Sequence, residues 1–352
     1  MLAMNRWTDL DVRHMRRAIR LSMGGYPAPN PHVGCVIAQG QEIVGEGYHS
    51  YAGGPHAEAV ALQQAGAKAA GATAYVTLEP CNHHGRTPPC SEALLAAKIK
   101  RVVIACLDPN PRAQGGMSRL EEHGVEVISG CLESQAAEKN EQFLTAMRLK
   151  RCFVTLKAAI SLDGRIALPN GESQWITAPD ARKQAHRLRA LCGAVLVGRN
   201  TVEKDNPALT ARIPGVVNQP MRVVLDPQGK LTSDRQVFDA AAPTLHLIEG
   251  KLGLKAGGQG FDPKDLCAML FKAGIMGVLI EGGAVTHSRF LQADLVDRIE
   301  LFVAPKVLGS GATWIELPEF LRVDEAPSFQ VASIKKLKVD VQISLRPERG
   351  NF

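Results

Sequence analysis

One histidine and two cysteines between Pro55 and Cys90 restrict the fold of this chain more than any other feature. His56 precedes Glu58 by two residues, Cys81 follows an apolar strand, and Cys90 opens a predicted helix. One nitrogen and two sulfur ligands are typical of a catalytic zinc site, which has three protein ligands and leaves the fourth position for water. The chain is therefore expected to bring a strand end and two helix starts to one point.

The spacing of these residues points to deamination but departs from the usual pattern. In zinc deaminases the metal activates water, and a glutamate that is not a ligand moves protons to the ring nitrogen and the leaving ammonia. The usual pattern ends in two cysteines that are two residues apart, whereas eight residues separate Cys81 from Cys90. A fourth protein ligand would make the site structural, and the histidines that could supply it are His49, His83 and His84. The His-x-Glu pattern and the strand-then-helix context favour the catalytic interpretation.

Length and composition indicate an ordinary globular protein with two domains. The chain has 352 residues, 45% of them hydrophobic, and eight cysteines. The first residues lack an apolar signal segment, so we expect a cytoplasmic protein with reduced cysteines rather than a disulfide framework. No run approaches the roughly 18 apolar residues of a membrane span, and we expect no membrane partner.

The charge distribution argues against nucleic acid as the substrate. Residues 1–150 carry 15 basic and 14 acidic residues, whereas residues 151–352 carry 26 and 21, within a net charge of +6. A nucleic-acid base deaminase with an accessory domain is the main alternative function, and it predicts a basic first half with aromatic residues for stacking. The near-neutral first half disfavours it, and the excess in the second half suggests anionic small molecules. A zinc-stabilised binding module is the non-enzymatic alternative.

The pattern of apolar residues predicts alternating strands and helices in both halves. In the first half we expect helices at 11–23, 57–65, from 90 to about 99 and near 118–123, and strands at 33–38, 43–48, 74–78, 101–105 and 125–128. A polar helix is expected at 133–150, and the predicted domains are 1–147 and 148–352. In the second half we expect strands at 153–157, 194–197, 222–226, 244–248, 277–281 and 299–303, and a helix at 285–293. Such alternation predicts sheets covered by helices.

Two further features suggest anionic ligands. The segment between Cys81 and Cys90 contains His83 and Arg86, which are good partners for an anionic group. In the second half, Glu281 and a pair of glycines separate an apolar strand from a helix, an arrangement that suits a pyrophosphate. A glycine pair is weak support on its own.

Several motifs along the whole chain resemble a single family. They are PNPHVG (29–34), HAE (56–58), TLEPCNHHGRTPPC (77–90), SLDGR (161–165), GESQWIT (171–177), DNPALT (205–210) and VAPKVLG (303–309). The chain is similar to the bifunctional riboflavin-biosynthesis proteins, in which a pyrimidine deaminase is fused to a 5-amino-6-(5-phosphoribosylamino)uracil reductase. The eight-residue cysteine spacing is that family's own form.

The resemblance implies an α/β fold with two different domains. The first would be a cytidine-deaminase-like three-layer α/β/α domain, and the second a dihydrofolate-reductase-like α/β domain. It implies hydrolytic deamination of 2,5-diamino-6-(5-phosphoribosylamino)pyrimidin-4-one, followed by NADPH-dependent reduction of the ribosyl group to ribityl. One zinc ion per chain and NADPH would be the cofactors, and the protein would be a homo-oligomer, either a dimer or a tetramer.

The resemblance also implies roles for individual residues. Glu58 would be catalytic, and His56, Cys81 and Cys90 would bind zinc. Substrate contacts are expected from Asn30, His49, His83, Arg86, Ser173, Arg189, Leu209, Arg212 and Glu281. NADPH contacts are expected from Ala159, Trp175, Thr201, Asp205, Gly283, Ala284, Val285, Thr286, His287, Ser288 and Arg289. Pro227 stands where relatives often have a small polar residue, and Lys157 and Asp205 are candidates to assist the reduction.

Overall fold

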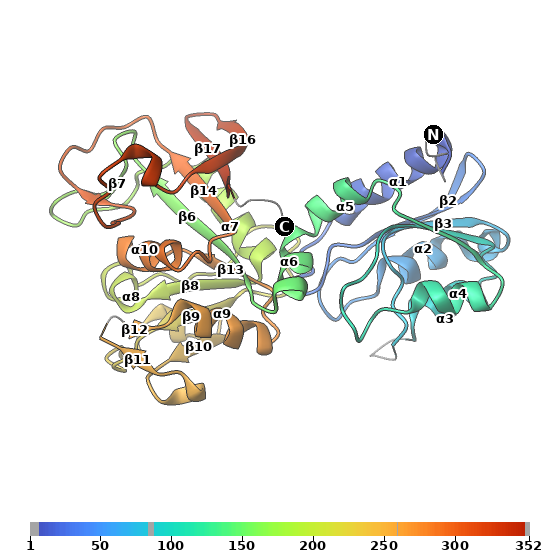
Figure 1. The fold of residues 1–352 in the computed structure, drawn as a ribbon, viewed down its shortest axis with the longest axis horizontal. Helices are drawn as coiled ribbons and strands as arrows, with labels where there is room; N and C mark the ends of the chain where they lie inside the picture. Colours follow the sequence, from blue (N-terminus) through green and yellow to red (C-terminus); the bar gives the residue numbers. More distant parts are fainter. Residues whose placement is uncertain (1–6, 84–87, 259, 349–352) are drawn as a thin grey trace. The chain divides into compact units, whose positions relative to one another are not determined.

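The computed structural model describes residues 7–83, 88–258 and 260–348. The chain divides into two compact units, Met1–Leu149 and Lys150–Phe352, each with its own sheet (Figure 1). The expected mixed α/β class with helix-covered sheets is confirmed in both units. Among the helices of the described residues, none combines the length and apolar character needed to cross a membrane.

The first unit contains a five-stranded sheet of order β2-β1-β3-β4-β5. β1 pairs antiparallel with β2 and β3, and the remaining strands pair in parallel. Helices α1 and α5 lie against one face, and α2, α3 and α4 cover the other (Figure 1). The elements are α1 (Asp9–Ser22), β1 (Gly34–Gln39), β2 (Glu42–Tyr48), α2 (Ala57–Ala65), β3 (Thr73–Leu78), α3 (Cys90–Ala96), β4 (Arg101–Cys106), α4 (Gly116–Glu122), β5 (Glu126–Ser129), α5 (Glu133–Lys139) and α6 (Glu141–Leu149).

Helix α1 begins with a capping box, and the Asp11 carboxylate of this box also joins the helix to the sheet. The Thr8 hydroxyl accepts a hydrogen bond from the Asp11 amide, and the Asp11 carboxylate accepts one from the Thr8 amide. Asp11 also accepts from the Tyr75 hydroxyl on β3 at 2.9 Å and from the Arg101 guanidinium on β4 at 2.6 Å. One buried acid therefore joins the start of a helix to two strands.

Helix α2 lies directly on strand β2 because two strand positions have no side chain. A Cβ atom at Gly47 would lie 2.2 Å from the Ala57 carbonyl oxygen, and one at Gly45 would lie 2.2 Å from that of Ala61. The alanine-rich helix and the glycines thus allow backbone to approach backbone. This contact sets the position of the α2 N-terminus, where His56 and Glu58 are found.

The second unit is built on an eight-stranded sheet of order β10-β9-β8-β13-β6-β14-β17-β16, parallel except for the last two pairings. Its main elements are β6 (Phe153–Ile160), β7 (Arg165–Ala167), α7 (Pro179–Cys192), β8 (Ala194–Gly198), α8 (Arg199–Asp205), β9 (Met221–Leu225), β10 (Thr244–Leu247), α9 (Pro263–Lys272), β13 (Gly277–Ile280), α10 (Ala284–Gln292), β14 (Arg298–Val303), β15 (Ala312–Thr313), β16 (Phe329–Leu337) and β17 (Asp340–Pro347). Two short strands, β11 (Ala256–Gly257) and β12 (Gly260–Phe261), pair with each other.

The core of the second unit explains which strands were predictable. The central parallel strands are buried along most of their length, so they form the continuous apolar runs that indicate buried strands. The β16–β17 hairpin was not predicted, and β16 is exposed at most of its positions. The polar helix expected at 133–150 is two helices, because the chain breaks at Asn140 between α5 and α6.

Candidate functional site

The structure brings His56, Cys81 and Cys90 together at one end of the first sheet. His56 caps α2, Cys90 begins α3, and Cys81 lies in the loop after β3. The His56 Nδ1 atom lies 3.2 Å from Cys90 Sγ and 3.5 Å from Cys81 Sγ, and all three donor atoms lie within 4.8 Å of one another. Among the described residues, these three form the cluster of side chains that could bind a metal ion.

The spacing of these donor atoms fits a tetrahedral zinc ion. With usual Zn–N and Zn–S bond lengths, a nitrogen and a sulfur ligand lie about 3.6 Å apart. The hydrogen bond with Cys90 lowers the pKa of Cys81 to about 4, and the same hydrogen bond raises the pKa of Cys90. The hydrogen bond thus favours the thiolate form of Cys81, the form that binds a metal.

Glu58 lies beside this cluster in the first turn of α2 and is only 3% exposed. Burial raises the pKa of its carboxyl, a change that the charge of His56 partly opposes. A buried carboxyl group next to a metal site, and not itself within the ligand group, can accept and return protons. The geometry therefore separates one buried carboxyl group from the three donors that could hold a metal ion.

Asn30 and His49 form the neighbouring wall. The Asn30 side-chain amide lies 3.0 Å from His49 Nε2, and His49 Nδ1 lies 2.9 Å from the Pro55 carbonyl oxygen. Both ring nitrogens of His49 are therefore engaged, and its ring meets that of His56 edge to face at 5.4 Å. His49 is placed to orient groups near the cluster rather than to serve as a fourth ligand.

Asn140 holds the Asn30 loop from a distant helix junction, and sequence reasoning missed it. Its side-chain oxygen accepts from the His32 amide at 2.7 Å, and its side-chain nitrogen donates to the His32 carbonyl oxygen at 2.8 Å. Asn140 is 2% exposed. In the sequence, Asn140 is only a polar residue inside a predicted helix. Its partner His32 lies 108 residues away, so no local pattern indicates this contact.

Glu79 and the segment after Cys81 complete the surroundings of the cluster. The buried Glu79 carboxylate accepts from the Gly115 and Met117 amides at 2.9 and 3.1 Å, which fixes the start of α4 against the Cys81 loop. Burial raises the pKa of the nearby Asp108 to about 6. His83 is exposed, whereas Arg86 and His84 lie outside the described residues.

A cavity of about 500 Å³ in the second unit contains many of the predicted reductase residues. It lies beside strands β6 and β13 and helices α7 and α8. Predicted residues that line it are Ala159, Ser173, Trp175, Arg189, Thr201, Asp205, Leu209, Arg212, Glu281, Gly283 and His287. Lys157, a candidate to assist the reduction, also lines it. Pro227 is not in the lining, and its carbonyl oxygen accepts from the Glu249 amide.

A buried ion cluster lies in the wall of this cavity. Arg189 donates two hydrogen bonds to the Glu281 carboxylate, at 2.6 and 3.0 Å, and Lys157 Nζ lies 3.6 Å from the same carboxylate. Burial alone would raise the pKa of Glu281, but the charges of Arg189 and Lys157 lower it to about 2. Glu281 is therefore an anion at neutral pH, held in one orientation by two cations.

The two predicted phosphate-binding arginines are in different situations. Arg189 directs its third nitrogen at the Thr210 carbonyl oxygen at 3.0 Å, so each of its three nitrogens already donates one hydrogen bond within the protein. Arg212 donates to the Thr210 hydroxyl at 2.9 Å. Burial and the neighbouring charge of Arg189 lower the pKa of Arg212. Within the described residues no carboxylate is paired with Arg212, which leaves it better suited to an anionic ligand.

The residues predicted to contact NADPH are only partly gathered at the cavity. Asp205 hydrogen-bonds with Ser173, while burial raises the pKa of its carboxyl. The Trp175 ring is 61% exposed at the cavity and has the Arg182 guanidinium 4.4 Å from its centre. From the 283–289 run, Ala284, Val285, Thr286, Ser288 and Arg289 lie outside the lining. The Ser288 hydroxyl accepts from the Glu316 amide, and Arg289 donates to the Phe261 carbonyl oxygen.

Two family models match the chain, one in each unit. Residues 8–106 match the cytidine and deoxycytidylate deaminase zinc-binding region. Residues 152–343 match the RibD C-terminal domain. The first match ends well before Asn140. This residue therefore lies outside the shared deaminase region, whereas its partner His32 lies inside it.

Curated relatives match both halves together. The riboflavin biosynthesis protein RibD of Aquifex aeolicus is 45% identical over 317 residues, which cover 86% of this chain and 89% of that protein. RibD of Escherichia coli is 41% identical and covers 95% of this chain and 99% of its own length.

Solved structures of similar proteins have the same fold. RibD of Acinetobacter baumannii is 40% identical, covers 97% of this chain and 99% of its own, and superposes with a TM-score of 0.89. A diaminohydroxyphosphoribosylaminopyrimidine deaminase/5-amino-6-(5-phosphoribosylamino)uracil reductase from Thermotoga maritima is 37% identical. It covers 96% of this chain and 99% of its own, with a TM-score of 0.85. The agreement over nearly the whole length, together with the ligand geometry and the two matched domains, shows that this chain belongs to the RibD family of riboflavin biosynthesis proteins.

Proposed function

We propose that the chain catalyses two consecutive steps of riboflavin biosynthesis, one in each unit. The first is hydrolytic deamination of 2,5-diamino-6-(5-phosphoribosylamino)pyrimidin-4-one, and the second is NADPH-dependent reduction of the ribosyl group to ribityl. The observation that carries the proposal is the buried Glu58 beside the His56, Cys81 and Cys90 donors in a chain that also has a RibD C-terminal domain. The proposed division of labour places the deaminase in residues 1–147 and the reductase in residues 148–352.

His56, Cys81 and Cys90 are the residues that would hold one zinc ion. A bound zinc ion supplies a coordinated water whose pKa is lowered toward neutrality, so that it can attack an amino-bearing carbon. The two thiolates and one imidazole are a donor set that zinc favours. The three-ligand count in the described residues supports a catalytic rather than a structural role.

Glu58 is assigned the proton transfers of the deamination. The reaction consumes one water and releases ammonia, so one proton must leave the water and others must reach the ring nitrogen and the departing amino group. Glu58 is buried beside the ligands and does not belong to the ligand group. Asn30 and His49, joined at 3.0 Å, would orient the pyrimidine edge, and His83 and Arg86 would contact the remaining substrate.

The second unit would bind NADPH and the deaminated nucleotide in the 500 Å³ cavity. NADPH, when bound, supplies a hydride to the ribose C1, and the ring oxygen that is released needs a proton. Lys157 is our first candidate to assist there because its ammonium lies 3.6 Å from Glu281 in the lining. Asp205, which hydrogen-bonds with Ser173, is the second.

Arg212 is the residue that we assign to the ribose phosphate in the second unit. Each nitrogen of Arg189 already donates one hydrogen bond, to Glu281 or to Thr210, so its main contribution to the phosphate would come through its charge and through the residues it holds. Leu209 and Ser173 would contact the same substrate. Ala159, Trp175, Thr201 and the 283–289 run would face the cofactor.

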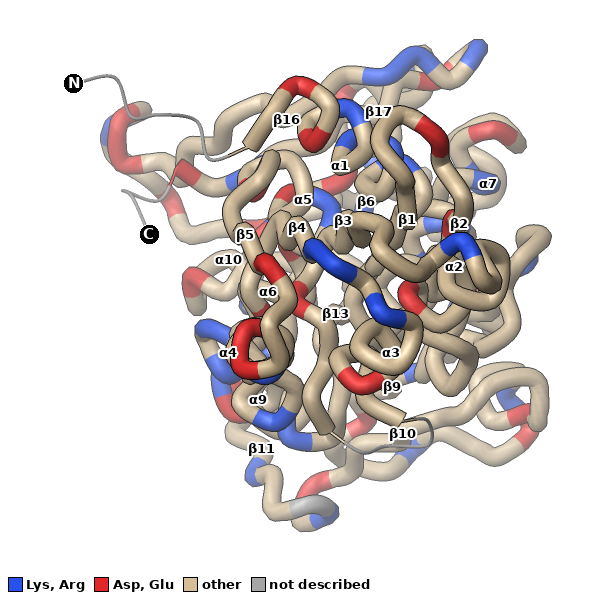
Figure 2. Tube along the Cα trace, turned by 90° about the vertical axis from the view of Figure 1, so that its right-hand side faces the viewer, with Lys and Arg blue, Asp and Glu red and all other residues tan. Residues whose placement is uncertain are grey.

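The proposed partners are small molecules. Residues 1–150 carry 15 basic and 14 acidic residues, and Figure 2 shows positions of both signs along the described elements of the first unit, whereas a nucleic-acid-binding domain is expected to have an excess of basic residues. The protein is proposed to act in the cytoplasm as a dimer or tetramer, and light scattering of the purified chain would test the oligomeric state.

The Glu58→Gln variant tests the deaminase assignment. The amide keeps the size of the side chain but cannot carry the proton, so we expect zinc to remain bound and ammonia release to fall by about 10²–10⁴-fold. The matched control is NADPH oxidation by the same variant when it receives the deaminated nucleotide, which should be unchanged.

Each alternative function has its own outcome in this experiment. Full ammonia release by Glu58→Gln with zinc bound would refute the catalytic role of Glu58. Failure of the unmodified protein to oxidise NADPH with the deaminated nucleotide would refute the reductase. Deamination of a single-stranded oligonucleotide at rates that match the nucleotide would support the nucleic-acid alternative instead.

A further inference from the structure

We propose that Arg222 is a positioning residue for the reductase cavity, although it does not line that cavity. It fixes the segment 236–242, on which the cavity loop 205–210 rests. The inference rests on the proposed reductase function and goes beyond it, because it assigns a role to a side chain outside the substrate and cofactor contacts. The loop supplies four residues of the cavity wall, namely Asp205, Pro207, Ala208 and Leu209.

Arg222 is an unusual residue for a fully buried strand position. It lies on β9 with 0% of its surface exposed. An arginine stays charged at any ordinary pH, and a buried guanidinium is unfavourable unless its donors find acceptors. Such a group is retained in a core only where its hydrogen bonds are satisfied, so its partners reveal what it organises.

The partners of Arg222 lie almost entirely in one surface-proximal segment. The guanidinium donates to the Gln236 carbonyl oxygen at 2.9 Å, to the Asp239 carboxylate at 2.8 Å and to the Asp239 carbonyl oxygen at 2.6 Å. Further bonds reach the Ala242 carbonyl oxygen and the Thr244 hydroxyl. One side chain thus gathers four residues that span the turn before β10.

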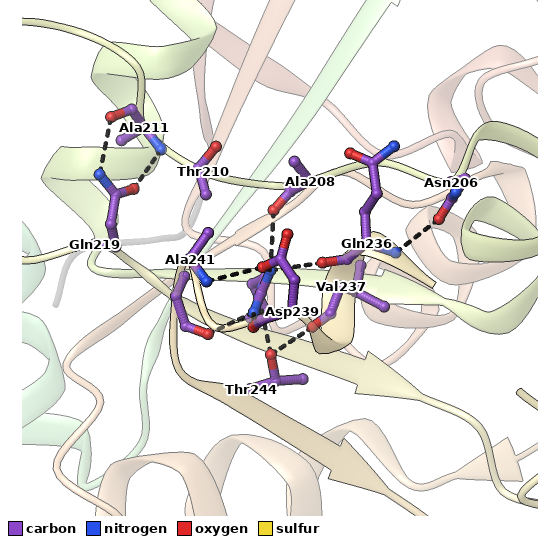
Figure 3. Close-up of polar contacts among 12 residues, drawn as sticks. Asn206, Ala208, Thr210, Ala211, Gln219, Gln236, Val237, Asp239, Ala241 and Thr244 are labelled. Carbon is purple, nitrogen blue, oxygen red and sulfur yellow. Dashed lines mark hydrogen bonds and ion pairs between the residues drawn. The ribbon is translucent and has the colours of Figure 1, made fainter. Parts of the chain in front are cut away.

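This segment in turn supports the cavity loop. The Gln236 amide donates to the Asn206 side-chain oxygen at 2.9 Å (Figure 3). Val237 packs in the same buried cluster as Leu209. The Ala208 carbonyl oxygen, labelled in Figure 3, lies 3.5 Å from the Arg222 guanidinium, a long contact. The short hydrogen bonds of Arg222 therefore hold the segment 236–242, and this segment contacts the loop.

The backbone of the loop needs such support. Asn206 and Leu209 have φ angles of +41° and +52°, in the left-handed region that side chains other than glycine adopt at a cost. The surroundings must therefore hold this conformation. Beyond the loop, the Gln219 side chain clamps the Ala211 backbone with two hydrogen bonds.

The opposite side of the loop faces the reacting groups. Arg189 and His186 both contact the Thr210 carbonyl oxygen at 3.0 Å, and Arg189 also holds Glu281. The loop thus lies between the Glu281 cluster and the segment organised by Arg222. Loss of the Arg222 network would let Asp205 and Leu209 move, while the residues of the Glu281 cluster keep their own bonds.

The experiment compares Arg222→Lys with Arg151→Lys in the full-length protein. Arg151 is a matched control because its guanidinium is also largely buried in the second unit, where it binds Asp297 at 2.6 Å, and it does not line the cavity. Both variants keep the charge and lose the planar fork. We expect Arg222→Lys to raise the KM for NADPH by about tenfold or more, whereas Arg151→Lys should leave it within about twofold at a similar loss of Tm.

The outcomes separate positioning from simple destabilisation. An unchanged KM for NADPH in folded Arg222→Lys, or an equal rise in both variants, would overturn the proposal. The unmodified protein must first oxidise NADPH with the deaminated nucleotide, and failure there would instead overturn the proposed function. Ammonia release should stay unchanged in both variants, because neither arginine belongs to the first unit.

A second variant covers the case in which Arg222→Lys does not fold. Asp239 contacts Arg222 with a side chain that is 47% exposed, so Asp239→Asn removes the anionic partner at a tolerant position. Like Arg222→Lys, this variant is expected to raise the KM for NADPH, here by about threefold, and to leave ammonia release unchanged. An unchanged KM in this variant would count against the proposal.

Discussion

Asn140 shows how the amide group of one side chain can hold a loop beside the candidate zinc site, here the loop that carries Asn30. It pairs with both backbone groups of His32, two residues from Asn30. We expect Asn140→Ala to lower kcat/KM for deamination by about tenfold or more, since displacement of a positioning group by about 1 Å can have effects of this size.

The matched control for Asn140 is Glu138→Ala, an exposed position on the neighbouring helix. It should leave ammonia release within about twofold of the unmodified protein. Equal kinetics of Asn140→Ala and the unmodified protein, at a temperature where both are folded, would show that the clamp is unimportant for the reaction.

Residues differed in how far the sequence alone could place them. His56, Glu58, Cys81 and Cys90 follow local patterns whose chemistry is recognisable without the fold, and the structure brings them together. Asn140 could not be found this way, because its partner is 108 residues away and an asparagine in a polar helix is unremarkable. Arg222 was hidden for a related reason, since a predicted strand gives no sign that a charged residue within it is satisfied.

At the scale of elements, Asp11 joins α1 to strands β3 and β4. Burial would raise the pKa of this carboxyl, but the hydrogen bonds from Arg101, Thr8 and Tyr75 hold it well below its usual value. A depressed pKa means that the stabilisation is present above about pH 4, the ordinary range of an aspartate, and is lost as the pH falls through the folded-state value.

We therefore expect Asp11→Asn to destabilise the first unit by about 1–3 kcal/mol at pH 7, because Arg101 loses its buried partner but keeps its contact with Glu126. The difference from the unmodified protein should shrink as the pH falls below about 4. Urea unfolding followed by circular dichroism at several pH values measures both effects. Asp9→Asn, an exposed acid in the same helical turn, should change stability by less than about 0.5 kcal/mol, and an equal effect of both variants would contradict the assigned role of Asp11.

The sequence predicted elements well where burial produces a simple pattern. The helix at 57–65 was predicted with the bounds that the structure has, and the buried strands of both sheets were found to within a few residues. The β16–β17 hairpin was missed because β16 packs on its partner strand while most of its side chains face solvent. The break at Asn140 was missed because the partner of Asn140, His32, lies 108 residues away and outside the helix.

At the scale of the whole molecule, two activities on one chain should respond differently to metal removal. A chelator should abolish ammonia release, because it would remove the zinc ion that His56, Cys81 and Cys90 are proposed to hold. NADPH oxidation should persist when the deaminated nucleotide is supplied, since the cavity residues of the second unit include none of these ligands. Assaying the two products separately, before and after dialysis against chelator, measures this.

Restoration by metal provides the control for that prediction. Zn²⁺ should recover ammonia release, whereas Mg²⁺ should not, because thiolate and imidazole donors are poor ligands for magnesium. Ammonia release that survives complete chelation, or NADPH oxidation that is lost in parallel with it, would contradict the assignment of the ion to the first activity alone.

The α/β fold class could be predicted because the sequence patterns that indicate it do not depend on the detailed positions of side chains. Chain length indicated two domains, the alternation of strands and helices indicated helix-covered sheets, and the mixed α/β fold with one large sheet in each unit is confirmed. The details of the second cavity could not be predicted, because residues from β6, α7, α8, the segment 281–283 after β13 and the 205–212 loop meet there only after folding. The engagement of Arg189 by Glu281 is one such detail, and it changes which arginine is suited to a phosphate.

The close contact of α2 with β2 has a consequence for anyone who engineers this protein. Replacing glycine by alanine is a common route to higher thermal tolerance, since it reduces the freedom of the unfolded chain. At Gly47 the added methyl group would push away the helix that carries Glu58, so a library screened for heat resistance would lose activity there. Gly257 and Gly258, where a Cβ would meet nothing within 4 Å, are safer first choices.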